Sequence, residues 1–479
     1  MVSKSLVVLT ISGIILCVGC SSNGNGSTGV AAALPPVQPA GMAKNYISHV
    51  IVIIQENRSF ENFFAGWPGA NAPMTGCASP APPPSGSVRS IAATSSVQKL
   101  GSGSGCPGHD SLVTLHQVTF QNNADLAHDW GSSMVDWNKG QMDGFSAYGT
   151  KHGPNQAYAY VEHSQIEPYR TMAQQYVLAD EMFPTEFGGS FTGHLTLVAG
   201  TDDIKLPTEA EVNFASHTPD DCDSPPGTKT SYLTPNREVH FFDGPFPCFD
   251  QFNTAAQVLD DAKVSWKIYA TKVLDAGFWE PFEAIKYVRY GPDWSKNIVA
   301  PQTQVLNDAA KGHLAAVSWV TPSKEDSDHP AYRGDKGPSW VASIVNAVGE
   351  SSYWPSSAII VVWDDWGGFY DNAPPPQLDY RGLGIRVPCL IISPYAKHSY
   401  VSHVQYEYGS ILRFIEEVYG LLPGSIGSRS LGYTDKRARS LNDAFDFHQK
   451  PRAFSPIHSK YPLSVFLHEP PSNEPVDTE

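Results

Sequence analysis

The sequence predicts an α/β fold, in which a mostly parallel sheet is flanked by helices on both faces. The first observation is a series of short apolar segments rich in β-branched residues, such as "HVIVIIQ" and "SAIIVVW". The second is that helix-length segments fall between them, such as "SWVASIVNAV" and "SILRFIEEVYGLL". This alternation is typical of parallel sheets. Ligands bind such sheets beyond the carboxyl ends of the strands, so we expect the functional residues at that edge.

The N-terminal region is predicted to lie outside this fold. One lysine precedes an apolar segment, Leu6–Leu16, which is too short to span a bilayer and is typical of a secretory signal. The segment ends in "LCVGC", which resembles a lipobox whose last residue, Cys20, is acylated. We therefore expect an exported protein of the bacterial envelope, with residues 1–20 as a signal and 21–45 as a tether. Lipid anchoring at Cys20 and plain secretion both remain open.

Residues 46–470 are predicted to form one domain, followed by a tail at 471–479. Two segments, about 66–108 and 202–248, interrupt the alternation and are predicted to be insertions near the rim of a cleft. The chain carries 48 acidic residues against 32 Lys and Arg, a net charge of −16. Nucleic-acid and polybasic membrane contacts need clustered cations, so we expect neither. An acidic site that holds a cation is compatible with this charge.

The cysteines fit an oxidising compartment. Two pairs flank loops rich in Pro, Gly and Ser, namely Cys77 with Cys106 and Cys222 with Cys248, and each pair is a candidate disulfide. Cys389 lies in the apolar segment "VPCLIIS" and is predicted to be a buried thiol. None of these five cysteines forms a CxxC pair, so a thiolate metal site is not expected.

Two adjacent carboxylates mark the end of one predicted strand. Asp364 and Asp365 follow "SAIIVVW" directly, and Gly367 and Gly368 come next. Neighbouring strand residues point to opposite faces, so the pair acts together only where the backbone bends, which the glycines permit. Two close anions repel each other unless a cation or a shared proton is present. A divalent metal would resolve the conflict, while the alternative is that one Asp caps a helix and the other faces solvent.

A second strand, "HVIVIIQ", ends in Glu56 and Asn57. Carboxylate and amide oxygens are ligands that hard cations prefer. Taken singly, Asn57 is more often the N-cap of the helix predicted at "RSFENFF". Together with Asp364 and Asp365, however, the two strand ends supply four oxygen donors at one crevice. The sequence therefore predicts one divalent metal ion, and Ca, Mg, Mn, Fe and Zn all remain open.

The segment "FGGSFTGHLTLVAGT" places Ser190 after two glycines, where a helix is predicted to begin. Backbone N–H groups at a helix N-terminus favour a phosphate or another oxyanion. The alternatives are a simple N-cap, or an esterase elbow that lacks its second glycine because Thr192 stands there. His194 lies one helical turn after Ser190 and is a candidate for substrate binding. His128 and His329 lie in loops expected at the cleft, and are candidates for catalysis and substrate binding.

Five segments of the chain resemble the bacterial phosphoesterase family, which includes phospholipases C and certain secreted acid phosphatases. The resemblance covers roughly residues 46–422. The segments that carry it are "HVIVIIQENRSFENFF", "HDWGSSMVDWNKGQMDGF", "FGGSFTGHLTLVAGT", "WDDWGGFYDNAPPP" and "RVPCLIISPYAKHSYVSHVQYEYGSILRFIEEVYGL".

The resemblance implies an alkaline-phosphatase-like core and a metal-assisted Ser or Thr nucleophile. Carried over by position, Ser190 is the nucleophile and also touches the metal, and Asn57 also contacts the phosphate. The histidines bind phosphate or transfer a proton. The implied metal ligands are Glu56, Asn57, Ser190, Asp364 and Asp365, and the implied histidines are His128 and His329.

Two departures bear on the branch of the family. Phospholipases C usually carry Thr followed by "x-P-N-R" where this chain has "S-F-T-G-H", and the common His after "GGFYD" is Asn372. These favour an acid phosphatase acting on small phosphate esters over a phospholipase C acting on phospholipid headgroups. Outside the family, two alternatives remain. One is a metal-independent esterase or lipase using Ser190, His403 and an Asp, and the other is a non-catalytic surface protein that binds Ca²⁺.

Overall fold

The computed structural model has a central β-sheet whose strands lie between His49 and Glu407 in the chain. The predicted signal, nearly all of the tether and most of the tail lie outside the described residues, so their assignment stays a prediction. Within the described part of the chain, no helix is both long and apolar enough to cross a membrane. The described ranges are 42–79, 111–122, 125–147, 155–274, 277–332, 334–421 and 431–472.

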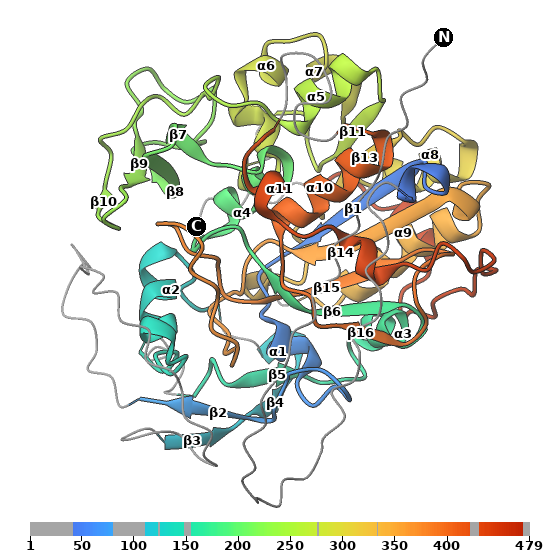
Figure 1. The fold of residues 1–479 in the computed structure, drawn as a ribbon, viewed down its shortest axis with the longest axis horizontal. Coiled ribbons are helices and arrows are strands. Elements are labelled where there is room, and N and C mark those ends of the chain that lie inside the picture. Colours follow the sequence, from blue (N-terminus) through green and yellow to red (C-terminus); the bar gives the residue numbers. More distant parts are fainter. Residues whose placement is uncertain are drawn as a thin grey trace, which may run out of the picture. The chain divides into compact units, whose positions relative to one another are not determined.

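A nine-stranded sheet forms the centre of the fold (Figure 1). Its order is β12-β11-β13-β1-β14-β15-β6-β16, and β17 also pairs with β6. All pairs are parallel except those of β15, which runs antiparallel to β14 and β6. The predicted fold class, a mostly parallel α/β sheet, is therefore confirmed. The strands are β1 (His49–Gln55), β6 (Val177–Phe183), β11 (Trp266–Tyr269), β12 (Ile298–Val299), β13 (Val317–Val320), β14 (Ser357–Trp363), β15 (Val387–Ile392), β16 (Tyr400–Ser402) and β17 (Tyr406–Glu407).

Helices cover both faces of this sheet, since every residue of β14 and all but the first of β1 are buried. Such burial explains why these strands are apolar throughout rather than alternating. The helices are α1 (Phe60–Phe64), α2 (Trp130–Trp137), α3 (Glu167–Gln175), α4 (Ser190–Ala199), α5 (Ala255–Ala262), α6 (Lys286–Arg289), α7 (Trp294–Asn297), α8 (Gln304–Lys311), α9 (Gly337–Gly349), α10 (Tyr408–Tyr419), α11 (Thr434–Arg437) and α12 (Leu463–Leu467).

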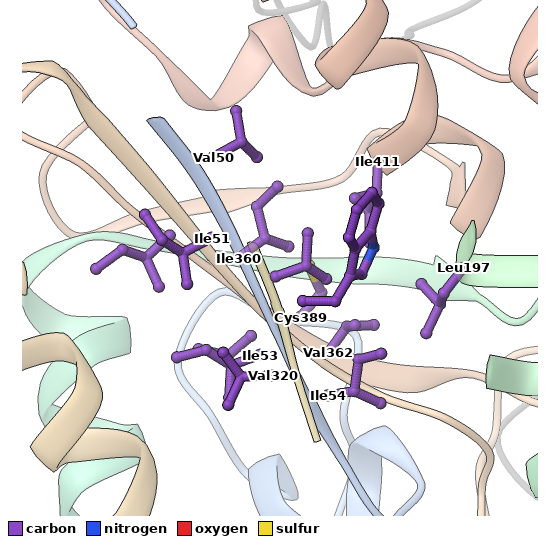
Figure 2. Close-up of a cluster of buried hydrophobic side chains, with 14 of the residues drawn as sticks. Val50, Ile51, Ile53, Ile54, Leu197, Val320, Ile360, Val362, Cys389 and Ile411 are labelled. Carbon is purple, nitrogen blue, oxygen red and sulfur yellow. The ribbon is translucent and has the colours of Figure 1, made fainter. Parts of the chain in front are cut away.

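The hydrophobic core lies where these layers meet (Figure 2). Aliphatic side chains of β1 and β14 pack with Leu197 of α4 and Ile411 of α10. Burying each such side chain contributes roughly 1.5–3 kcal/mol to folding. Cys389 of β15 belongs to this core, and it is free and buried as predicted. Burial raises the pKa of its thiol, which keeps the sulfur protonated and unreactive.

Among the described residues, three smaller sheets lie outside the central one. The predicted insertion at 202–248 contains an antiparallel sheet of order β10-β9-β8-β7, a regular structure that its loop-like composition did not indicate. The strands of the three sheets are β2 (Thr75–Ala78), β3 (Ser111–Thr114), β4 (His116–Val118), β5 (Ala159–Val161), β7 (Asp203–Lys205), β8 (Glu209–Ala215), β9 (Thr230–Leu233) and β10 (Val239–His240).

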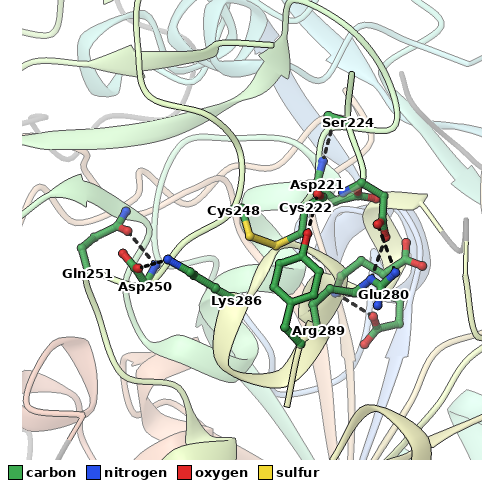
Figure 3. The surroundings of a disulfide bond; sticks show 12 residues. Asp221, Cys222, Ser224, Cys248, Asp250, Gln251, Glu280, Lys286 and Arg289 are labelled. Atoms are coloured by element: carbon green, nitrogen blue, oxygen red, sulfur yellow. Dashed lines mark hydrogen bonds and ion pairs between the residues drawn. A yellow bond between two sulfur atoms is a disulfide. The ribbon is translucent and has the colours of Figure 1, made fainter. Parts of the chain in front are cut away.

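One predicted disulfide, Cys222–Cys248, is present and joins residues 26 positions apart (Figure 3). Cys77 is also disulfide-bonded. Its predicted partner, Cys106, lies outside the described residues.

Candidate active site

The site forms where two neighbouring parallel strands end. The last residue of β1, Gln55, is paired with the last residue of β14, Trp363. Glu56 and Asn57 therefore leave the sheet beside Asp364 and Asp365, at the carboxyl edge where ligands bind in such folds.

Helix capping, the simpler explanation for several of these residues, does not account for them. Helix α1 is capped by Ser59, whose side chain accepts from Asn62 N at 3.2 Å, and not by Asn57. Helix α4 has Gly189 at its N-cap and begins at Ser190, whose side chain does not cap it. The fully described segment 364–386, between β14 and β15, contains no helix for either aspartate to cap.

Ser190, Asn57, Asp365 and His128 form the first of two side-chain clusters, here called the nucleophile group. Ser190 Oγ donates to Asp365 Oδ2 at 3.3 Å. Asn57 Nδ2 donates to the same oxygen at 3.1 Å and to Ser190 Oγ at 3.2 Å. His128 Nε2 lies 2.9 Å from Asn57 Nδ2. The hydroxyl thus faces a carboxylate that can accept its proton.

The protonation of His128 follows from its two neighbours. Its Nδ1 lies 2.5 Å from the carbonyl oxygen of Leu126, and because a carbonyl only accepts, Nδ1 carries the hydrogen. Asn57 Nδ2 is a donor, so His128 Nε2 is the acceptor. With the amide in this orientation, Nε2 accepts from Asn57 and His128 orients that amide.

Glu56, His194 and Asp364 form the second cluster, here called the acid group. His194 Nε2 lies 2.9 Å from Glu56 Oε1 and 3.8 Å from Asp364 Oδ2. One ligand atom from each residue lies within 4.8 Å of the others, and all three side chains are fully buried. Asp364 Oδ1 accepts from Asn57 N at 2.9 Å, while Oδ2 has no hydrogen-bond partner among the described residues.

The electrostatics of the acid group fit a divalent cation. Burial lowers the pKa of His194 to about 4, against the opposing effect of Asp364, so its imidazole is neutral at neutral pH. Glu56, Asp364 and the adjacent Asp365 are fully buried carboxylates, and burying negative charge without compensation is costly. Carboxylate oxygens and a neutral imidazole are ligands for divalent metals. The unpartnered Asp364 Oδ2 gives such an ion a ready ligand.

Close backbone packing brings the two clusters together. Gly367 has φ +62°, and a Cβ there would lie 2.2 Å from Asn57 O, so only glycine fits the bend after Asp365. Its N–H donates to Asp365 Oδ1 at 2.7 Å. A Cβ at Gly193 would lie 2.5 Å from Asp364 O, which shows how closely α4 approaches the end of β14. This approach sets His194 against the carboxylates.

The structure brings together the predicted metal ligands and Ser190, but it divides Asp364 from Asp365. Asp364 faces the acid group and Asp365 the nucleophile group, and Asn57 joins the two clusters through its backbone N and its side chain. The Asn57 amide presents nitrogen, not oxygen, to Asp365, so metal ligation by this residue requires a half-turn of the amide. His329 lies beside His128, with ring centroids 5.9 Å apart.

The structure places two histidines in surroundings that differ from those expected for their predicted roles. His194, a candidate for substrate binding, is fully buried and contacts Glu56, which makes it a candidate metal ligand. Its place one turn after Ser190 on α4 was the only pattern pointing to it. His403, the histidine of the alternative triad, is 63% exposed and pairs with Asp180 at 2.9 Å, whereas Ser190 contacts Asn57 and Asp365.

The model of the Phosphoesterase family matches residues 47–422, and the chain belongs to this family. The family predicted from the sequence motifs is therefore confirmed. Among curated relatives, the non-hemolytic phospholipase C of Pseudomonas aeruginosa is 24% identical, covering 83% of this chain and 57% of the relative. Phospholipase C A of Mycobacterium tuberculosis is 25% identical, covering 86% of this chain and 79% of the relative.

The chain thus spans little more than half the length of the Pseudomonas relative, and the same holds for the non-hemolytic phospholipase C of Burkholderia pseudomallei. Among solved structures, a protein in the alkaline phosphatase superfamily from Vibrio parahaemolyticus is 12% identical. The match covers 57% of this chain and 63% of the other, with a TM-score of 0.33. This likeness is too weak to bear on function.

Proposed function

We propose that the protein is a metal-dependent phosphoric ester hydrolase that uses Ser190 as its nucleophile. One observation carries the proposal: the hydroxyl at the start of α4 donates to Asp365, beside a buried acid group with an unpartnered oxygen. Family membership and the phospholipase C names of the relatives support the same reaction class.

The residues that would hold the divalent ion are Glu56, His194 and Asp364, with Asp365 and Asn57 adjacent. When bound, such an ion offsets the negative charge of the phosphate and of the three carboxylates. Backbone N–H groups at the start of α4 bind the phosphate oxygens.

The covalent step uses three side chains of this protein. Asp365 Oδ2 accepts the Ser190 proton as Oγ attacks phosphorus, which forms a phosphoseryl group and breaks the ester P–O bond. The leaving alkoxide takes a proton from His329. His128 is the weaker candidate for this role, because its ring already donates through Nδ1 and accepts from Asn57. Water then hydrolyses the phosphoseryl group and releases phosphate.

For the substrate, we favour a small phosphomonoester, as in the acid phosphatase branch. The support is the "SFTGH" motif, which begins at the nucleophile position and stands where phospholipases C usually have "TxPNR". Asn372, which replaces the common histidine, bonds to Asn71 and Arg386, neither of which belongs to the acid or nucleophile group. The second candidate is phospholipid hydrolysis of the phospholipase C type, and the names of the curated relatives favour it.

We further propose that the protein is exported, with residues 1–20 as a signal and 46–470 as the catalytic domain. The support is the short apolar segment that ends at Cys20, together with the disulfide Cys222–Cys248. A lipid on Cys20 would tether the enzyme to a membrane.

The test measures hydrolysis of p-nitrophenyl phosphate, an alkyl phosphate and phosphatidylcholine, before and after exhaustive chelation. We expect activity that chelation removes and divalent ions restore. Ser190→Ala should lower kcat by about 10³-fold or more, and acid quenching of the wild type should trap phosphate on Ser190. Ser357→Ala is the matched control, because this buried serine lies at the opposite end of β14. Near wild-type turnover by Ser190→Ala would exclude the covalent step.

A further inference from the structure

His329 is held by a buried network that reaches both strand ends of the site. The histidine lies in the segment after β13, directly after Asp328. The side chains that hold this segment come from distant parts of the chain and are all buried: Gln55, Arg58, Tyr169 and Trp363.

Two of these side chains bind the backbone of the segment. The amide of Gln55 donates to Asp326 O at 3.1 Å and accepts from Asp328 N at 3.0 Å. Arg58 donates to Asp328 O through Nε at 2.8 Å and through Nη2 at 2.5 Å. Both residues flank the Glu56–Asn57 pair, so the backbone before His329 is fixed directly to the end of β1.

The carboxylate of Asp328 completes the network. Its Oδ2 accepts from Tyr169 OH at 2.8 Å and from Trp363 Nε1 at 3.0 Å. Trp363 is the residue before Asp364. Asp328 thus connects three segments: the end of β1 through Arg58, the end of β14 through Trp363, and the loop that carries His329.

We propose that Asp328 is a positioning residue, which sets the place of the His329 ring relative to Asn57 and Asp365. This inference rests on the proposed function, in which His329 protonates the leaving alkoxide. A buried carboxylate beside a buried arginine is costly, and hydrocarbon side chains would fill this space with a smaller desolvation penalty. The network therefore contributes geometry rather than stability.

Moving His329, the proposed general acid, out of position slows the release of poor leaving groups more than that of good ones. Alkoxides need protonation as they leave, whereas p-nitrophenolate does not. We expect Asp328→Ala to lower kcat for an alkyl phosphate by about 100-fold, and kcat for p-nitrophenyl phosphate by less than about fivefold. Asp328→Asn keeps an oxygen for Tyr169 and Trp363 and should restore most of the loss.

Tyr169→Phe removes one hydroxyl from the network and provides a second test of the positioning role if Asp328→Ala does not fold. It should lower alkyl phosphate turnover by about threefold to tenfold, with p-nitrophenyl phosphate turnover nearly unchanged. The matched control is Tyr419→Phe, because Tyr419 donates to Ser48 O and Ala316 O, at the amino ends of the strands. This control should leave both rates unchanged.

The outcomes separate this inference from the proposed function. Equal losses on both substrates in the Asp328 and Tyr169 variants, with no rescue by Asp328→Asn, would show a merely structural role and overturn the inference alone. A wild-type protein that hydrolyses neither substrate with any divalent metal would overturn both. Selective loss on the alkyl phosphate, rescued by Asp328→Asn, supports the positioning role.

Discussion

Two of the regions where acidic side chains gather differ in how the charge is compensated. Around the Cys222–Cys248 disulfide, the protein supplies its own donors (Figure 3). Glu280 accepts from Phe282 N and Glu283 N at 3.3 and 2.9 Å, and Asp223 accepts from Arg289 Nε at 2.6 Å. At the candidate site, Glu56, Asp364 and Asp365 lie together beside a neutral histidine, and one oxygen of Asp364 has no hydrogen-bond partner among the described residues.

The acids near the disulfide have a structural role, whereas those at the candidate site are the ones that we propose bind a ligand. Near the disulfide, backbone N–H groups, an arginine and a retained proton compensate the charge, so nothing further has to bind. At the candidate site, protein donors reach Asp365 and one oxygen of Asp364. Neither group contains a Lys or Arg, however, and a bound cation would compensate the remaining charge. A group that the fold leaves uncompensated is destabilising on its own, and such groups mark sites of binding or catalysis.

The largest expected effect is that of Asp364→Asn. Losing this ligand should lower kcat for p-nitrophenyl phosphate by about 10³-fold or more. Under chelation, however, the variant should unfold at a higher urea concentration than the wild type, because it removes one buried like charge. Urea titrations with and without chelator measure this contrast. Equal metal-dependent stabilisation of variant and wild type would remove Asp364 from the proposed ligands.

Removing the disulfide tests the opposite region. Cys222→Ser combined with Cys248→Ser frees a loop closed over 26 positions, and the unfolding free energy should fall by about 3 kcal/mol. Turnover at 25 °C should remain close to wild type, since neither cysteine belongs to the acid group or the nucleophile group. A loss of turnover without a loss of stability would show that the two regions are coupled.

The pH dependence of the unfolding free energy tests whether Glu280 keeps its proton in the folded protein. Burial raises the pKa of Glu280 to about 8 from its ordinary 4.5. Between these values the folded protein holds a proton that the unfolded chain has released, so this contribution is full below pH 4.5 and is lost as pH rises to about 8. Glu280→Gln should flatten the slope between pH 5 and 8 by up to about 1.4 kcal/mol per unit. An unchanged urea midpoint profile would contradict this assignment.

The smallest expected effect is that of Asp223→Asn. Asp223 is 37% exposed in its ion pair with Arg289, so losing its charge should lower the unfolding free energy by less than about 1 kcal/mol. High salt should make this difference smaller still. Turnover should not change. A decrease of several kcal/mol in the unfolding free energy, measured by urea denaturation, would contradict this expectation.

Much of the fold was predictable because β1 and β14 are continuous apolar runs buried on both faces. The reversed direction of β15 was not predicted, since its composition matches that of its parallel neighbours. A parallel connection normally contains a crossover helix, and residues 364–386 carry Gly and Pro without a helical pattern. That absence was the available indication of an antiparallel strand.

The position of the site was predictable for the same reason, because polar residues directly follow two strands. The division of labour between Asp364 and Asp365 was not, because it depends on Asn57, whose φ of 55° turns its backbone N toward one aspartate and its side chain toward the other. The contact of His194 with Glu56 depends on how closely α4 approaches β14. Asp328 was missed because its partners come from distant segments.

The reversal of β15 has a consequence for how this protein can change. Because the strand runs back along β14, the chain between them leaves and re-enters the sheet at one edge. The stretch is pinned at its start by Asp365 and at its end by Arg386, which pairs with Asp371 at 3.0 Å. Most of the stretch between these anchors is buried, but Leu378 is 48% exposed, so chain inserted there would keep the strand order.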